Sequence, residues 1–63
     1  MKRTKLVKHL LANNCVFKRE GSNHTIYQNP KTGKKSAVPR HSEIGDMLCN
    51  KICEQLDISM IKK

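Results

Sequence analysis

The residues GSNHTIY, at positions 21–27, place a histidine directly after a glycine-led turn. An imidazole has an unperturbed pKa of about 6.5, so it can take up and release protons near neutral pH. Cleavage of an RNA phosphodiester needs such transfers, because the 2′-hydroxyl loses a proton as it attacks phosphorus and the leaving 5′-oxygen gains one. His24 is therefore a candidate general acid or base. On spacing alone the alternative is stronger, a histidine that only hydrogen-bonds to backbone.

Polar and basic side chains accompany this histidine. Gly21 permits close approach of another backbone. Hydroxyl and amide groups can bind a phosphate, and cations stabilise the charge of a phosphorane. If the strands pair in the expected register, the flanking cations and His24 lie within reach of one nucleotide. The predicted RNA-binding residues are Lys18, Arg19, Ser22, Asn23, Lys34, Lys35 and, from a later loop, Arg40.

The elements that position these residues are predicted in the order helix, three antiparallel strands, helix. Thr4 can cap a first helix, which presents Leu6, Val7, Leu10 and Leu11 on one face and ends at Asn13–Asn14. The strands are predicted in CVFKRE, NHTIYQN and KKSAVP, at 15–20, 23–29 and 34–39, with turns at 21–22 and 30–33.

A second helix is predicted in MLCNKICEQL, at 47–56, with Asp46 as its cap. Its core-facing stripe is predicted to be Met47, Leu48, Ile52 and Leu56, with Cys49 and Cys53 at the flank. Neither helix can bury its apolar stripe alone. We therefore expect an α+β fold of one domain, residues 1–63, with both helices on one face of the sheet and the other face free.

Charge and composition narrow the function. The chain has 63 residues and a net charge of +8, and residues 1–41 carry ten basic side chains against Glu20 alone. This segregation indicates a polyanionic partner. A core this thin predicts an open, shallow site that suits a polymer, in a soluble, cytoplasmic protein with reduced cysteines. Cys49 and Cys53 could offer two ligands to zinc but lack two more, so we expect no metal, no cofactor and no membrane association.

The ordered motifs GSNH, NPKTGK, AVPRH and ICEQLDIS resemble the HicA toxins of bacterial toxin–antitoxin pairs, over nearly the whole chain. The resemblance implies a double-stranded-RNA-binding-domain-like fold and an mRNA interferase, an endoribonuclease that cleaves mRNA without a metal or ribosome. It also implies neutralisation by a HicB antitoxin that covers the active site. The family's functional histidine falls at His24, although many members have it at the position of Asn23. Asn14 replaces a common glycine, and the aromatic that often follows that glycine is displaced to Phe17.

Other interpretations remain open at this stage. The same fold could serve as a non-catalytic RNA-binding module in which His24 only donates a hydrogen bond. A DNA-binding protein is less favoured, because neither helix combines a basic face with base-reading residues. His41 could contact RNA or the antitoxin, but a brace at the start of the second helix is favoured. His9 is expected to be exposed to solvent.

Overall fold

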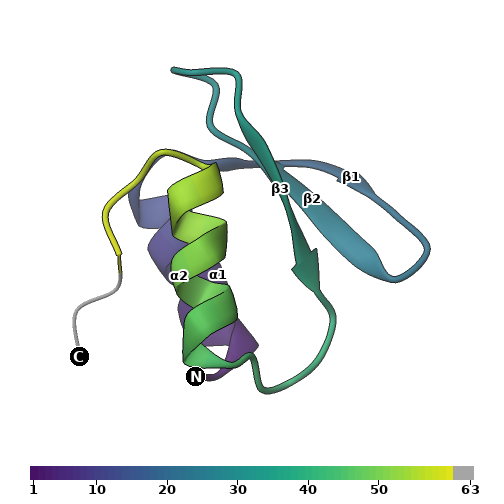
Figure 1. Cartoon of the computed structure of the whole chain (residues 1–63). Coiled ribbons are helices and arrows are strands. Elements are labelled where there is room, and N and C mark those ends of the chain that lie inside the picture. Colours follow the sequence, from purple (N-terminus) through teal and green to yellow (C-terminus); the bar gives the residue numbers. More distant parts are fainter. Residues whose placement is uncertain (61–63) are drawn as a thin grey trace.

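The computed structural model of the protein describes residues 1–60. Both helices lie on one face of a three-stranded antiparallel sheet of order β1-β2-β3, so the expected α+β architecture is confirmed (Figure 1). The smallest dimension of the molecule is 16 Å, which leaves room for one helical layer on one sheet. The elements are α1 (Arg3–Ala12), β1 (Val16–Glu20), β2 (His24–Gln28), β3 (Lys35–Pro39) and α2 (Asp46–Gln55).

Cross-strand register divides the sheet residues between its two faces, because partners on paired strands point the same way. The face covered by the helices carries Phe17, Tyr27 and Ser36 in one row and Glu20, Thr25 and Val38 in the next. The open face carries three rows, Val16 with Gln28 and Lys35, Arg19 with Ile26 and Ala37, and His24 with Pro39. His24 therefore stands at one end of the open face.

A β-bulge lies in β1 at Lys18. Phe17 pairs with Tyr27, whereas Arg19 pairs with Ile26, so the extra residue shifts the register between them. In a regular strand, residues 17 and 19 would share a face. The bulge instead turns Arg19 to the open face while the ring of Phe17 stays against that of Tyr27, edge to face at 6.4 Å.

The core fills the space between the helices and the sheet. Buried apolar residues come from every element except β1, and they are Leu6, Leu10, Cys15, Tyr27, Val38, Ile44, Cys49, Ile52, Cys53 and Leu56. In α1 the prediction is confirmed for Leu6 and Leu10, but Leu11 is exposed.

The face that α2 turns to the core differs from the prediction. Met47 is 87% exposed and Leu48 is 40% exposed, so their place in the core stripe is wrong. The buried residues Cys49, Ile52, Cys53 and Leu56 have the spacing i, i+3, i+4 and i+7 of one helix face. The two cysteines, expected at the flank, thus belong to the centre of the stripe.

Neither helix begins as the sequence predicts. The N-cap residues are Lys2 and Gly45, and neither makes a side-chain cap bond, so Thr4 and Asp46 do not occupy the N-cap positions assigned to them. The exit of α1 is confirmed, since Asn14 adopts a left-handed conformation with φ of 68°.

Asn29 joins the β2–β3 turn to the end of α2. Its buried side-chain Nδ2 donates to the carbonyl of Leu56 over 2.8 Å, and its Oδ1 accepts from the amide of Lys31 over 3.0 Å. Gly33 takes a positive φ of 77° in the same turn. The predicted turn at residues 30–33 is thereby confirmed, and Asn29 fixes it against the core.

His9 does not face open solvent as expected. Its ring is half-buried, and Nε2 lies 2.7 Å from the carbonyl oxygen of Ser59. This histidine therefore holds the segment that follows α2 against α1.

Candidate functional site

The candidate site begins with the tight turn between β1 and β2. Glu20 and Thr25 are the last paired residues before the turn. Just beyond them, the amide of Gly21 donates to the carbonyl of His24 over 2.7 Å. A Cβ atom at position 21 would lie 3.1 Å from that carbonyl oxygen, which is closer than ordinary van der Waals contact. Gly21 thus permits the close approach of the two backbones, as predicted.

The side chain of His24 is exposed on the open face of the sheet, opposite Pro39. Within residues 1–60 its imidazole makes no hydrogen bond and no ion pair, and nothing there occupies its two ring nitrogens. An imidazole of this kind can donate a proton to a ligand or accept one from it. The backbone-bonded histidine that spacing alone favoured is not what the fold contains.

Arg19 is the cation that the register brings nearest to His24 on the open face. It pairs with Ile26, two residues along β2 from His24, so the two side chains are diagonal neighbours. Diagonal neighbours have Cα atoms about 7–8 Å apart, within reach of a long side chain. A phosphate bound at the imidazole could therefore also contact the Arg19 guanidinium, a contact that depends on the bulge at Lys18.

Ser22 and Asn23 occupy the turn itself, and both are exposed beside His24. Their side chains make no hydrogen bonds within the part of the chain that the structure describes. Lys18 is exposed at the bulge. These three residues are thus available to a ligand, and their contact with RNA stays a prediction.

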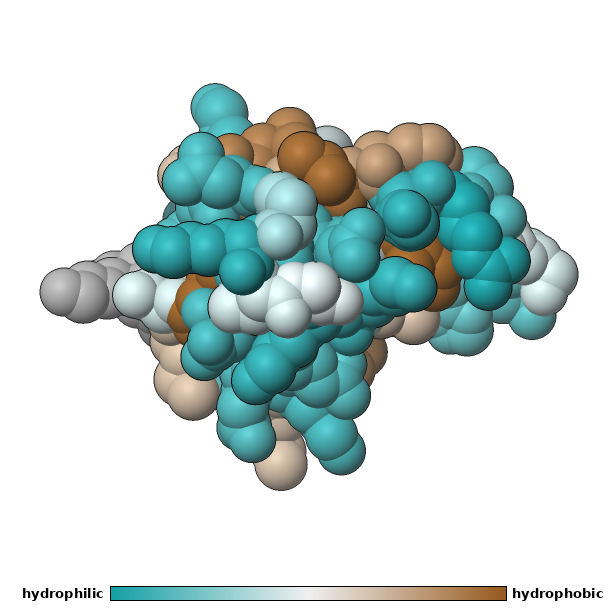
Figure 2. Space-filling view, turned by 90° about the horizontal axis from the view of Figure 1, so that it is seen from above, coloured by the Kyte–Doolittle hydropathy of each residue, from teal (hydrophilic) through white to brown (hydrophobic). Residues whose placement is uncertain are grey.

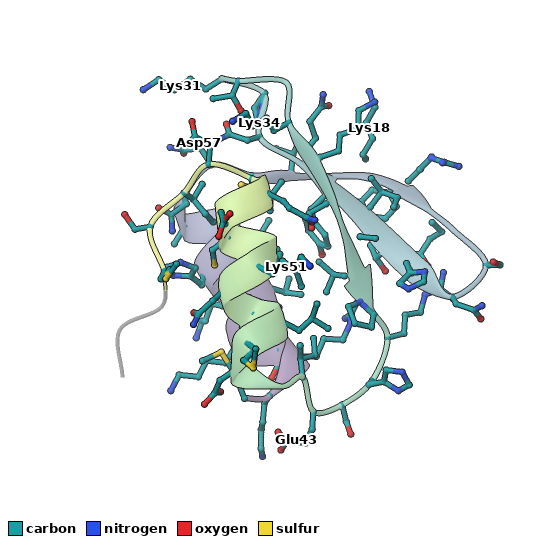
Figure 3. All side chains as sticks on the ribbon, viewed as in Figure 1. Lys18, Lys31, Lys34, Glu43, Lys51 and Asp57 are labelled. Carbon is teal, nitrogen blue, oxygen red and sulfur yellow. The ribbon has the colours of Figure 1, made fainter. Side chains whose placement is uncertain are left out.

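Lys34 and Lys35 lie at the other end of the open face. Lys35 pairs with Gln28, four residues along β2 from His24, and Lys34 belongs to the β2–β3 turn with Lys31 (Figure 3). At about 3.4 Å per residue the separation is about 14 Å along the strand. The register thus separates Lys35 from His24 along the sheet, and contact of these lysines with the same nucleotide as His24 stays a prediction.

The side chain of Arg40 hydrogen-bonds to the backbone of the β1–β2 turn. Its Nη1 donates to the carbonyl of Ser22 over 3.2 Å, and its Nη2 donates to the carbonyls of Gly21 and of His24, the latter over 3.4 Å. The same guanidinium forms an ion pair with Glu20. The predicted contact of Arg40 with RNA stays a prediction, and the contacts observed are structural ones.

Glu20, Thr25 and Arg3 support this arrangement, and the sequence analysis did not identify them. Oε1 of Glu20 accepts from the Thr25 hydroxyl over 2.9 Å, and that hydroxyl oxygen accepts from Arg3 over 3.1 Å. Arg3 also donates through Nε to the carbonyl of Pro39 over 3.0 Å. The available signal was Glu20 itself, the one acidic residue among the first 41, placed next to the turn glycine.

His41 follows Arg40 in the loop that leads to α2. It is exposed, and its side chain makes no hydrogen bond within residues 1–60. The brace that the sequence favoured for the start of the second helix is therefore wrong.

Charge is segregated in space as well as along the chain. Beside the β1–β2 turn, the carboxylate of Glu20 is already paired with Arg40. The three rows of the open face given above contain no acidic residue. The carboxylates of Glu43 and Asp57 lie at the two ends of α2, away from the β1–β2 turn (Figure 3). Viewed from the end with the β2–β3 turn, the surface is mostly hydrophilic and the apolar groups form small patches (Figure 2). The open face thus suits a polyanion.

The cysteines lie apart from this site. All three are free and fully buried, where half-buried positions were expected. Burial raises the pKa of the Cys15 and Cys49 thiols, and the nearby Asp46 carboxylate raises that of Cys49 further against the lowering effect of the N-terminal amine. Within residues 1–60, no three His, Cys, Asp or Glu side chains gather as metal ligands would. None of the helices described there is long and apolar enough to cross a membrane.

The comparison with protein families agrees with the motifs and the fold. The family model described as "HicA toxin of bacterial toxin-antitoxin" matches residues 3–58, which include both helices and all three strands. No curated protein and no solved structure matches the chain. The match spans the turn with Gly21 and His24 as well as the loop with Arg40. The chain therefore belongs to the HicA family of toxins from bacterial toxin–antitoxin systems.

Proposed function

We propose that this toxin is an endoribonuclease that cleaves mRNA without a metal ion, with His24 as the residue that transfers a proton. The observation that carries the proposal is the imidazole of His24, which has no partner among residues 1–60 and lies at the end of an open, basic sheet face. Its backbone carbonyl is bound by the Gly21 amide and by Arg40, so the residue is held in place while its ring is free. A fixed backbone position and free ring nitrogens together fit the geometric demands of general acid–base catalysis.

In the reaction proposed here, the ribose 2′-hydroxyl attacks the adjacent phosphorus and the 5′-oxygen leaves. His24 either accepts the proton of the 2′-hydroxyl or supplies one to the 5′-oxygen. Arg19, its diagonal neighbour, stabilises the additional negative charge on phosphorus. Lys34 and Lys35 bind phosphates farther along the strand, where they contribute affinity.

A HicB-type antitoxin is the proposed protein partner. Membership of the family supports a toxin–antitoxin pair, and the basic open face supports a partner with a complementary acidic surface. A gene beside that of the toxin, encoding a protein of about twice its length that copurifies with it and blocks cleavage, is the expected finding. A toxin gene without such a neighbour would weaken this part of the proposal.

Substitution of His24 distinguishes catalysis from simple RNA binding. Because the imidazole is exposed and makes no hydrogen bond or ion pair within residues 1–60, His24→Ala is expected to change the free energy of unfolding by less than about 0.5 kcal/mol. The variant should still bind RNA, yet it should neither arrest growth on expression nor cleave RNA in the presence of a chelator. Asn50→Ala, an exposed change on α2, serves as the control for expression. A His24→Ala protein that arrests growth and cuts RNA as wild type does would refute the proposed role.

A further inference from the structure

Arg40 donates to an unusual concentration of acceptors for a surface arginine. The guanidinium bonds to three carbonyls of one turn, those of Gly21, Ser22 and His24, and pairs with the carboxylate of Glu20. All four acceptors belong to residues 20–24, the segment that connects β1 to His24. Arg40 itself follows β3, so this single side chain ties the turn to the third strand.

The contacts continue from Glu20 to the first helix. The second carboxylate oxygen of Glu20 accepts from Thr25, whose hydroxyl accepts from Arg3, and Arg3 reaches the carbonyl of Pro39. Pro39 is the cross-strand partner of His24. The backbone on both sides of His24 and opposite it is therefore fixed by one connected set of charged and hydroxyl groups.

We propose that Glu20 and Arg40 form a clamp that positions His24, and that Arg40 acts through this clamp and not as a contact to RNA. The inference rests on the proposed function, since it assigns the clamp to the presentation of the catalytic imidazole. It goes beyond that function because neither residue touches a reacting atom. Both are positioning residues.

The two roles for Arg40 make opposite predictions. If Arg40 bound an RNA phosphate, Lys would largely replace it, since lysine also binds phosphate as a point charge. Removal of the competing Glu20 carboxylate would then favour RNA binding. A clamp instead requires the planar fork of arginine to reach several acceptors at once, which lysine cannot do, and it requires the Glu20 carboxylate.

The variants Arg40→Lys and Glu20→Gln test the clamp, with Glu54→Gln as the matched control. Glu54 is an exposed residue of α2 whose side chain makes no hydrogen bond or ion pair within residues 1–60. A partly exposed ion pair contributes little to global stability, so all three proteins are expected to fold. Two quantities are measured, the hydrogen-exchange rate of the Gly21 amide and the split between kcat and KM for RNA cleavage.

The clamp predicts faster exchange of the Gly21 amide in Arg40→Lys and Glu20→Gln, because the bond from Gly21 to His24 loses its support. It also predicts that kcat falls by roughly 10- to 100-fold while KM stays near that of wild type. The Glu54→Gln protein should match wild type in both. Unchanged exchange at Gly21 would overturn the clamp, and faster exchange with unchanged kcat would overturn its role in positioning His24.

Failure of the proposed function would be recognised separately. If His24→Ala cleaves RNA as well as wild type, the catalytic assignment fails and positioning of a catalytic group fails with it. The Gly21 exchange rate does not depend on cleavage, so it still decides whether Glu20 and Arg40 hold the turn.

Discussion

The amide of Gly21 and the carbonyl of His24 are joined by a hydrogen bond of 2.7 Å that closes the β1–β2 turn. The glycine and the histidine of the GSNH motif are thus in direct backbone contact. The absence of a side chain at position 21 allows this contact, since a Cβ atom would meet the His24 carbonyl at 3.1 Å.

Gly21→Ala is therefore expected to displace the turn. The added methyl group must push the His24 carbonyl by a few tenths of an ångström, which we expect to destabilise the fold by about 1 kcal/mol and to lower kcat by about 10-fold. Urea unfolding and the rate of RNA cleavage measure the two effects. The control is Gly45→Ala, where an added Cβ meets nothing within 4 Å. Equal cleavage rates for the two variants would show that the turn tolerates the methyl group.

Asn29→Ala tests the link between the β2–β3 turn and α2. Without the Asn29 side chain, the buried carbonyl of Leu56 loses the bond from Nδ2. The free energy of unfolding should therefore fall by about 1–3 kcal/mol. Asn50→Ala, on the exposed side of α2, should be neutral or slightly stabilising because alanine favours helix. Chemical denaturation compares the two proteins. A loss as small for Asn29→Ala as for Asn50→Ala would mean that the bond contributes nothing.

The strands and turns could be predicted from the sequence because their signals are local. The β-branched and aromatic residues of β1 and β2, and the Pro and Gly of the β2–β3 turn, specify their own conformations. The core stripe of α2 could not be fixed in the same way. Met47 and Leu48 compete with Cys49 and Cys53 for the same role, and cysteine is buried as often as larger apolar residues. The contacts of α2 with β3 set which face of the helix turns to the core.

The candidate site could be predicted only in part for a related reason. His24 and Gly21 form a local motif, whereas the bonds from Arg40 join residues 16 to 19 positions apart and those from Arg3 join residues 22 and 36 positions apart. The separation of Lys35 from His24 likewise follows from the register of β2 with β3, which composition does not determine. The sequence shows which residues are charged, but it does not show which of them form ion pairs in the fold.

A double substitution, Lys34→Gln with Lys35→Gln, separates affinity from chemistry. Lys35 pairs with a residue about 14 Å from His24 along β2, and Lys34 precedes it in the turn, so both should contribute to RNA binding and leave kcat at saturating RNA unchanged. Loss of two phosphate contacts should reduce the slope of log K against log salt by about 1.4. Binding is measured over a salt series, with Lys5→Gln and Lys8→Gln on α1 as a control of equal charge. An equal loss of slope in the control would remove Lys34 and Lys35 from the site.

The buried thiols of Cys15 and Cys49 are expected to react slowly with disulfide reagents at neutral pH. Burial raises the pKa of Cys15 and Cys49 above the ordinary value of 9.0, so little thiolate is present and a disulfide reagent should react much faster after unfolding. Because the unfolded thiols lose their protons first, stability should fall as pH rises past 9.0. Urea midpoints at rising pH measure this loss. A variant with Cys15→Ala and Cys49→Ala should lose less stability than wild type over the same rise in pH. An equal loss in the variant would contradict the claim that these two thiols cause it.

The most direct test of the account is the single-turnover rate of RNA cleavage by His24→Gln, measured in chelator with the toxin in excess so that all RNA is bound. Glutamine keeps a polar side chain at this exposed position but cannot transfer a proton. The account predicts that the variant binds RNA as wild type does and cleaves it at least about 100-fold more slowly. Cleavage at the wild-type rate would contradict the central claim that His24 transfers a proton in the reaction.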